Sequence, residues 1–148
     1  MSFEGSALVD WAAFSRSRSE LGAGFVRILG YFREDGVKSV AAIESAMRAG
    51  SAAALVIPAH TLKGEARQFG ADPLGAVAEK IEAIARDCVE TRDTPDEALQ
   101  HVVALRPLFE ETLAMLEREA NPLVERRSVG GFGTAGFGKR AAGGFGTR

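Results

Sequence analysis

Three residues with the chemistry of group transfer lie within about one helical turn of one another: His60, Lys63 and Gly64. An imidazole is largely uncharged near neutral pH and is then a competent nucleophile. A lysine one turn away can offset the charge of a transferred phosphoryl group. Glycine at the next position removes a side chain that would keep a partner's active site away. From type and spacing alone, these three are either ordinary surface residues or a small reactive face with His60 as its nucleophile.

The helical pattern around these residues predicts that His60 faces solvent. Apolar residues recur at steps of three and four and make the buried stripe, which consists of Leu55, Ala59, Leu62, Ala66 and Phe69. His60 lies outside that stripe. Lys63, Gly64 and Arg67 follow it by three, four and seven residues, so all four share one outward face. Pro58 is expected to distort this helix locally. With two histidines and one cysteine in the chain, no cluster of metal ligands is predicted.

Helices are predicted to position this face, because strand signals are nearly absent and helical periodicity recurs along the chain. A short first helix, containing Leu8, Trp11 and Phe14, is expected to cover one end of the core. Cap and proline signals set the limits of four longer helices. These run from Ser19 or Glu20 to Gly50, from Ser51 to Phe69, from Asp72-Pro73 past Cys88, and from Thr94-Pro95 to Leu116. The predicted fold is therefore all-α, an antiparallel four-helix bundle with a short N-terminal capping helix.

Several single residues carry further expectations. Gly36 is expected to kink or split the first long helix, and Pro107 to bend the last one. Thr94-Pro95-Asp96-Glu97 has the pattern of a capping box with proline at the first helical position. Cys88 and the aromatic residues of the first helix are assigned to core packing. His101 lacks a neighbouring Lys-Gly pair and is interpreted as structural or exposed.

The charge distribution separates residues 1–120, the predicted bundle, from a Gly/Phe-rich basic tail at 121–148. Residues 1 to 125 carry 13 Lys/Arg against 20 Asp/Glu, a net charge of −7, whereas residues 126 to 148 carry five basic residues and no acidic one, a net charge of +5. The acidic body argues against nucleic acid as the main partner. The tail repeats Gly-Phe-Gly around Phe132, Phe137 and Phe145 and is expected to be disordered, because it buries too little to offset its ordering entropy.

The compartment is expected to be the cytoplasm. A single cysteine forms no internal disulfide, Glu4 and Asp10 interrupt any apolar leader, and the longest uncharged run of the body is too short for a bilayer. We therefore expect a soluble monomer that does not associate with membranes.

The motif resembles that of a known family. "AHTLKG" at residues 59–64, followed by Phe69-Gly70-Ala71, looks like the signature of histidine-containing phosphotransfer (HPt) domains, and "FVRILGYFREDG" upstream is similar as well. The likeness covers roughly residues 7 to 118. It implies a four-helix bundle whose exposed histidine takes a phosphoryl group from an aspartyl phosphate on a receiver domain and passes it to another. His60, Lys63 and Gly64 carry over directly. The resemblance implies no cofactor of the chain's own, since the receiver supplies Mg²⁺ and the aspartate.

The neighbouring helix is expected to contribute Glu82. The turn between the two helices centres near residues 71 and 72, so a residue as far beyond it as His60 is before it lies opposite His60. Family members similarly place a hydrogen-bonding side chain, often glutamine, on this helix. Glu82 either accepts the Nδ1 proton and leaves Nε2 as the nucleophile, or forms a plain surface pair with Arg86. Arg86, Arg67 and Thr61 are assigned to partner binding, with a solvated face as the alternative for Arg67.

The chain has no Gly-rich nucleotide loop, so it is not expected to phosphorylate itself from ATP. A stand-alone phosphorelay shuttle is therefore predicted. The rival from another class is a non-catalytic helical adaptor that only binds a signalling partner. The phosphotransfer segment of a chemotaxis-type kinase is disfavoured, because no kinase or dimerisation region follows.

Overall fold

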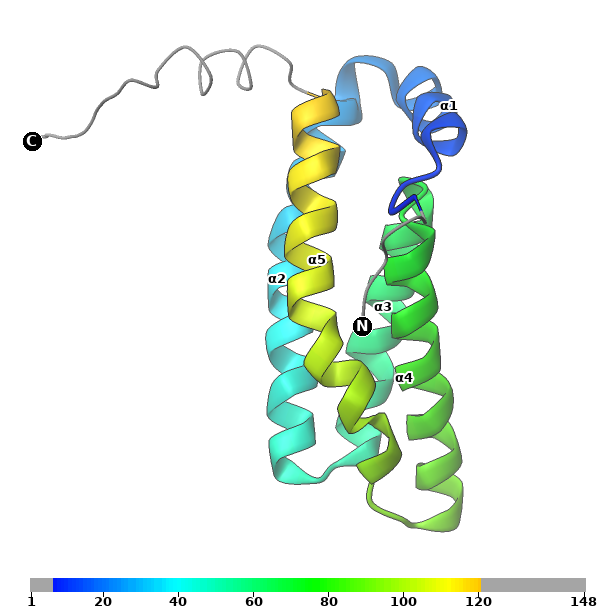
Figure 1. Cartoon of the computed structure of the whole chain (residues 1–148), viewed down its shortest axis with the longest axis vertical. Coiled ribbons are helices and arrows are strands. Elements are labelled where there is room, and N and C mark those ends of the chain that lie inside the picture. Colours follow the sequence, from blue (N-terminus) through cyan, green and yellow to red (C-terminus); the bar gives the residue numbers. More distant parts are fainter. Residues whose placement is uncertain (1–6, 121–148) are drawn as a thin grey trace, which may run out of the picture. The chain divides into compact units, whose positions relative to one another are not determined.

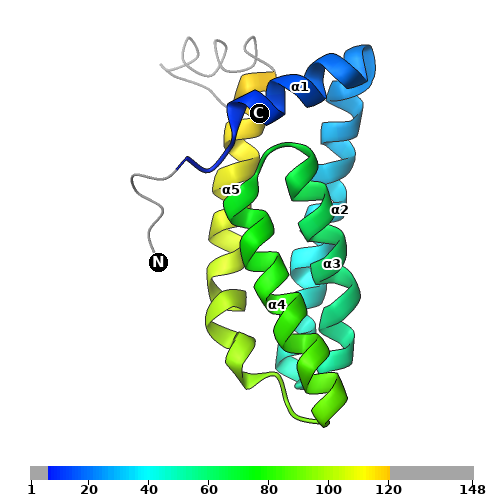
Figure 2. The same cartoon turned by 90° about the vertical axis from the view of Figure 1, so that its right-hand side faces the viewer.

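The computed structural model describes residues 7–120, and all regular structure in that range is helical. The helices are α1 (Trp11–Leu21), α2 (Phe25–Ala49), α3 (Ala52–Gln68), α4 (Asp72–Thr91) and α5 (Leu99–Ala120), with 3₁₀ turns at Gly22–Gly24 and Asp96–Ala98. Helices α2 to α5 run in alternating directions, and α1 lies across the end at which α3 turns into α4 (Figure 1; Figure 2). The predicted antiparallel four-helix bundle with a short capping helix is confirmed.

The compact unit of the bundle ends at Ala114, and Met115–Ala120 continue α5 as helix. The disorder expected for the tail concerns residues 121–148, which lie outside the described residues.

Capping residues and two glycines set the limits of α3. The Ser51 hydroxyl accepts a hydrogen bond from the Ala54 amide at 3.2 Å, which caps the N-terminus of the helix. Gly50 before it and Gly70 after it have φ values of +67° and +78°, a left-handed conformation that costs glycine little. The Asp10 amide donates to the Gly70 carbonyl at 2.8 Å, and a side chain at Gly70 would collide with the Asp10 carbonyl. This close approach fastens the start of α1 to the α3–α4 turn.

A chain of aromatic rings connects the capping helix to the bundle core. Phe14 of α1 packs edge-on against Phe25 with ring centroids 5.2 Å apart, and Phe25 packs against Phe69 at 5.7 Å. Phe69 meets Phe32 at 5.4 Å, and Phe32 meets Phe109 of α5 at 5.8 Å. Such pairs contribute about 0.5–1.5 kcal/mol each beyond the area they bury. The rings therefore couple α1, α2, the end of α3 and α5 in one core.

Three details of the sequence-based assignment are wrong. Ser19 and Glu20 belong to α1 rather than to the next helix, because α1 ends at Leu21 with Gly22, at a φ of +56°, as its C-cap, and α2 starts at Phe25. Trp11 is 37% exposed: its ring packs against Phe14 on one side, with centroids 5.1 Å apart, so it borders the core rather than filling it. Cys88 is only partly buried, in the last turns of α4.

Two helix starts also differ slightly from expectation. Asp72 is the first residue of α4, with Ala71 in the capping position, so its carboxylate lies in the first turn, where the helix dipole favours negative charge. The Thr94–Glu97 segment opens α5 through the 3₁₀ turn Asp96–Ala98, and the α-helix proper begins at Leu99. Helix α5 continues through Pro107, and its N-terminal part runs in a different direction from the rest (Figure 1).

Gly36 does not split α2, which is continuous from Phe25 to Ala49. Its missing side chain leaves room for the ring of Phe109 on α5: a Cβ at position 36 would overlap the Cε1 and Cζ atoms of that ring. The glycine therefore serves helix packing and not a break in the helix.

We expect Gly36→Ala to lower the free energy of unfolding. Overpacking a core costs about 1–3 kcal/mol, which exceeds the gain of about 1 kcal/mol that alanine has over glycine in a helix. Gly30 is the matched control, because it lies in the same helix and a Cβ there meets nothing within 4 Å. Urea unfolding should give opposite signs for Gly36→Ala and Gly30→Ala. Equal stabilisation by both would show that the Phe109 contact is not limiting.

Candidate functional site

His60 and Glu82 meet across the α3–α4 interface. The two residues stand eleven positions before and after Ala71, so the antiparallel pairing of α3 and α4 brings them opposite each other. His60 Nδ1 lies 2.9 Å from Glu82 Oε2. The side chain of His60 is 58% exposed, whereas that of Glu82 is 7% exposed. The imidazole therefore lies at the surface, and its Nδ1 atom contacts the buried carboxylate of Glu82.

Two cations share the same carboxylate. Lys63 Nζ lies 2.8 Å from Glu82 Oε1. Arg86, one turn further along α4, donates from Nε to Oε2 at 2.9 Å, and its terminal nitrogen lies 2.8 Å from the same oxygen. Lys63 is expected from the sequence to stand on the outward face, but its side chain is only 22% exposed and is turned toward α4. Glu82 contacts His60 and pairs with Arg86 at the same time, and because Glu82 is buried, its contact with Arg86 is not the plain surface pair given as the alternative.

These contacts determine the charge and the proton positions of the site. Burial alone would raise the pKa of the Glu82 carboxyl, but hydrogen bonds from Lys63, Arg86 and His60 outweigh it and lower the pKa to about 2. Glu82 is therefore ionised at neutral pH and only accepts hydrogen bonds, so His60 must donate from Nδ1. Nε2 is then the nitrogen with a lone pair available for attack. Because the pKa is lower than its ordinary value of 4.5, Glu82 stabilises the fold above about pH 4.5, and this contribution is lost as the pH falls toward 2.

Arg67 forms a second bridge between the helices. It donates to Glu79 Oε1 at 2.6 Å, with both side chains about half exposed. The stem of Arg67 passes over Gly75 of α4, where a Cβ would lie 3.0 Å from its Cγ. Sequence reasoning missed Glu79 and Gly75. The signal for Gly75 was an isolated glycine inside a helical pattern, which often marks a close approach.

The outward side of α3 around His60 is open. Thr61 and Gly64 are exposed, and a Cβ at Gly64 would meet nothing within 4 Å. Helix α3 continues across Pro58 from Ala52 to Gln68, so the proline does not end the helix that carries His60. The structure thus brings together His60, Lys63, Glu82 and Arg86, and leaves Gly64 and Thr61 beside them without covering side chains.

On the other side of α3, the carboxyl group of Glu65 is half-buried and lies within the influence of Asp35 on α2. Burial, which is the larger cause, and the neighbouring Asp35 carboxylate raise the pKa of Glu65 to about 7. Asp35 precedes Gly50 by fifteen residues and Glu65 follows it by fifteen. Counting from the turn, which points to Glu82 opposite His60, would have found this pair too.

We expect this pair to make stability depend on pH near neutrality. The folded-state pKa of Glu65 is above its ordinary value of 4.5, so its contribution is complete below about pH 4.5 and is lost as the pH rises through about 7. The melting temperature should therefore fall over this range in the wild type and much less in Glu65→Gln. Asp35→Asn, which removes the neighbouring charge, should move the fall to lower pH. The same pH slope in all three proteins would contradict the assignment.

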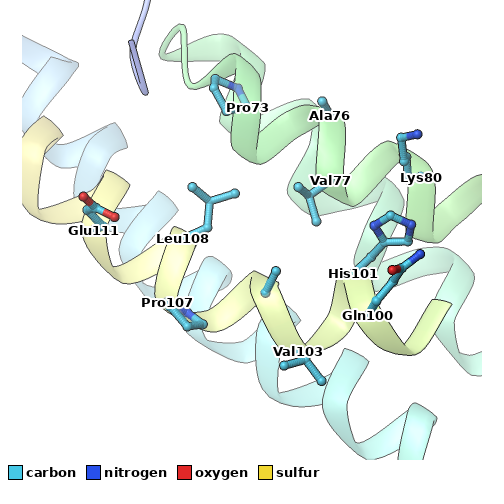
Figure 3. A pocket seen from close by; sticks show the side chains of 11 residues that line it. Pro73, Ala76, Val77, Lys80, Gln100, His101, Val103, Pro107, Leu108 and Glu111 are labelled. Carbon is cyan, nitrogen blue, oxygen red and sulfur yellow. The ribbon is translucent and has the colours of Figure 1, made fainter. Parts of the chain in front are cut away.

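A groove of about 720 Å³ lies between α4 and α5, away from His60. Figure 3 shows Pro73, Val77 and Lys80 of α4 on one wall and residues of α5, including His101 and Leu108, on the other. The α4 residues that contact His60, Lys63 and Arg67 are not among those that line it. His101, the second histidine, therefore belongs to a different part of the surface from the Glu82 cluster.

Within residues 7–120, no group of three or more His, Cys, Asp or Glu side chains is arranged to hold a metal ion. In the same range, no helix combines the length and apolar character needed to cross a bilayer.

Comparison with known proteins places this bundle in a family. The Hpt domain family model matches residues 27–121. A solved structure that matches is that of histidine-containing phosphotransfer protein B from Pseudomonas aeruginosa PAO1, with a TM-score of 0.67 and 21% sequence identity, covering 78% of this chain and 96% of that one. The comparison with curated proteins gives no match.

The family model covers almost all of α2 and the whole of α3, α4 and α5, which are the four helices of the bundle. The chain belongs to the Hpt domain family. Family and fold support a histidine phosphotransfer role in two-component phosphorelays, in which such proteins work with receiver-type partners.

Proposed function

We propose that the chain is a phosphorelay intermediate, which accepts a phosphoryl group on His60 from the aspartyl phosphate of one receiver domain and passes it to another. The contact between His60 Nδ1 and Glu82 Oε2 at 2.9 Å carries the proposal. It fixes the tautomer and the ring orientation, and it leaves Nε2 on the exposed part of the ring.

In the proposed reaction, the Nε2 lone pair attacks phosphorus while the P–O bond to the aspartyl group breaks. The electron pair of that bond leaves with the carboxylate oxygen of the receiver. The ring, which retains its Nδ1 proton, gains positive charge, and the Glu82 carboxylate hydrogen-bonded to that proton stabilises it. Transfer to the next receiver reverses these bond changes. Mg²⁺ comes from the receiver, and this chain contributes no cofactor.

Lys63 and Arg86 supply positive charge for the phosphoryl group. Both are held on Glu82, Lys63 from one turn beyond His60 on α3 and Arg86 from one turn beyond Glu82 on α4, so they are positioned before the phosphoryl group arrives. Preorganised cations stabilise developing negative charge without reorganising at the moment of reaction. In the phosphorylated protein, Lys63 keeps its contact with Glu82 Oε1 and donates another of its three protons to a phosphoryl oxygen. Arg67, Arg86 and Thr61 then border the surface that the receiver covers.

The test is to mix the protein with ³²P-labelled phosphorylated receiver domains. Label that is lost in acid and retained in base identifies phosphohistidine, and its appearance on this chain supports the relay function. A complex with a receiver that never transfers label would instead indicate the non-catalytic adaptor.

A further inference from the structure

Ile57 is a large apolar residue on the outward side of α3, and it is 69% exposed. Single exposed apolar residues are common on protein surfaces and need no explanation by themselves. Ile57 differs from the apolar residues of the buried stripe, whose side chains are only 0–1% exposed. It therefore lies on the opposite, outward face of the helix and contributes nothing to the core.

Ile57 precedes His60 by three residues and Gly64 by seven, so the three lie along one face of α3. Ala53, one turn before Ile57, is exposed as well. The strip formed by these residues contains no charged side chain, because Lys63 is turned toward α4, where it and Arg86 are paired with Glu82. The surface beside the imidazole is therefore apolar on its N-terminal side and unobstructed at Gly64 on its C-terminal side.

Transfer geometry requires that this strip be covered. The reacting phosphorus must approach Nε2 to about 3–3.5 Å before the bond forms. Side chains one turn apart on a helix are about 5–6 Å apart at Cβ. A protein that carries the phosphoryl group on its own side chain therefore contacts Ile57 whenever it reaches His60, whereas a small phosphodonor does not.

We propose that Ile57 is a docking residue, which packs against an apolar side chain next to the phosphorylated aspartate of the receiver domain. This inference rests on the proposed relay function. Ile57 supplies binding to the receiver and takes no part in the bond changes at His60. Gly64 gives clearance on the opposite side, so the receiver approaches His60 with its apolar contact toward the N-terminal half of α3.

The experiment compares Ile57→Ala and Ile57→Glu with Val103→Ala and Val103→Glu. Val103 is a matched control, because it is also β-branched and is 68% exposed, but it lies on α5. Two reactions are measured for each protein: label transfer from a phosphorylated receiver, as kcat and KM, and labelling of His60 by phosphoramidate, a small donor that needs no docking.

We expect Ile57→Ala to lower kcat/KM for the receiver about tenfold, through KM, and Ile57→Glu to lower it by about a hundredfold. Phosphoramidate labelling should stay unchanged in both, and the Val103 variants should match the wild type in both reactions. Equal receiver kinetics for the wild type and both Ile57 variants would overturn the docking role, as would a parallel loss of phosphoramidate labelling. If the wild type accepts label from phosphoramidate but from no receiver, the relay function fails, and the docking role fails with it.

Discussion

His60→Ala is expected to abolish phosphoryl acceptance and to leave the fold intact. The variant removes the nucleophile, whereas the side chain is 58% exposed and fills no core site. Glu82 keeps Lys63 and Arg86 as partners, so no buried carboxylate is left unpaired. Surface substitutions of this kind change the free energy of unfolding by about 0.5 kcal/mol or less. Label transfer from a receiver and thermal unfolding, measured on the same preparation, test both parts.

The matched control is His101→Ala, which removes the second histidine, in the groove between α4 and α5. This variant should accept label like the wild type. If His60→Ala still becomes labelled, or if His101→Ala is the variant that loses transfer, the assignment of the phosphorylated residue is wrong.

Gly64→Gln is expected to slow transfer by on the order of a hundredfold without harming the bundle. Gly64 lies one turn beyond His60 on the same face, and a Cβ there meets open space. The helix should gain up to about 1 kcal/mol, because glutamine is a better helix former than glycine. The new side chain nevertheless stands where the receiver must approach, and a misplacement of about 1 Å costs about 10²-fold in rate.

Gly30→Gln separates the steric effect from helix stabilisation. Gly30 is also an open position in a helix, but it lies near the start of α2. Both variants should melt at or above the wild-type temperature, and only Gly64→Gln should transfer slowly. A Gly64→Gln protein as fast as the wild type would mean that the receiver does not approach over this part of α3.

The bundle could be predicted from the sequence because burial, caps and turns agree along most of the chain. All five residues of the predicted α3 stripe, from Leu55 to Phe69, are buried. The errors arose where local signals conflict with packing. Glycine has a low helix propensity, which predicted a break at Gly36. The helix is nevertheless continuous, and the contact with Phe109 requires a residue without a side chain there. The predicted start of α2 is too early because Leu21 has the spacing of the stripe that begins at Phe25, although Gly22, with a φ of +56°, ends α1 between them.

The site could be predicted in part. The helical periodicity predicts that His60 is exposed, and its side chain is exposed. Counting residues from the α3–α4 turn predicts that Glu82 lies opposite His60, and the two side chains are in contact. The same counting cannot give the directions of long side chains. Lys63 lies on the outward face by spacing but is drawn to Glu82, since burying a carboxylate is costly unless cations pair with it. Arg67 similarly reaches Glu79 because Gly75 leaves space for its stem.

The contact between Gly36 and Phe109 also has a consequence for sequence variation. The two positions lie 73 residues apart, yet they share one volume at the α2–α5 interface, where the ring occupies the space that a side chain on α2 would need. A larger residue at position 36 fits only when position 109 becomes smaller, because a close-packed core has little room to expand. Among homologous sequences the sizes of these two residues should therefore vary inversely, and a substitution neutral in one homologue should be harmful in another.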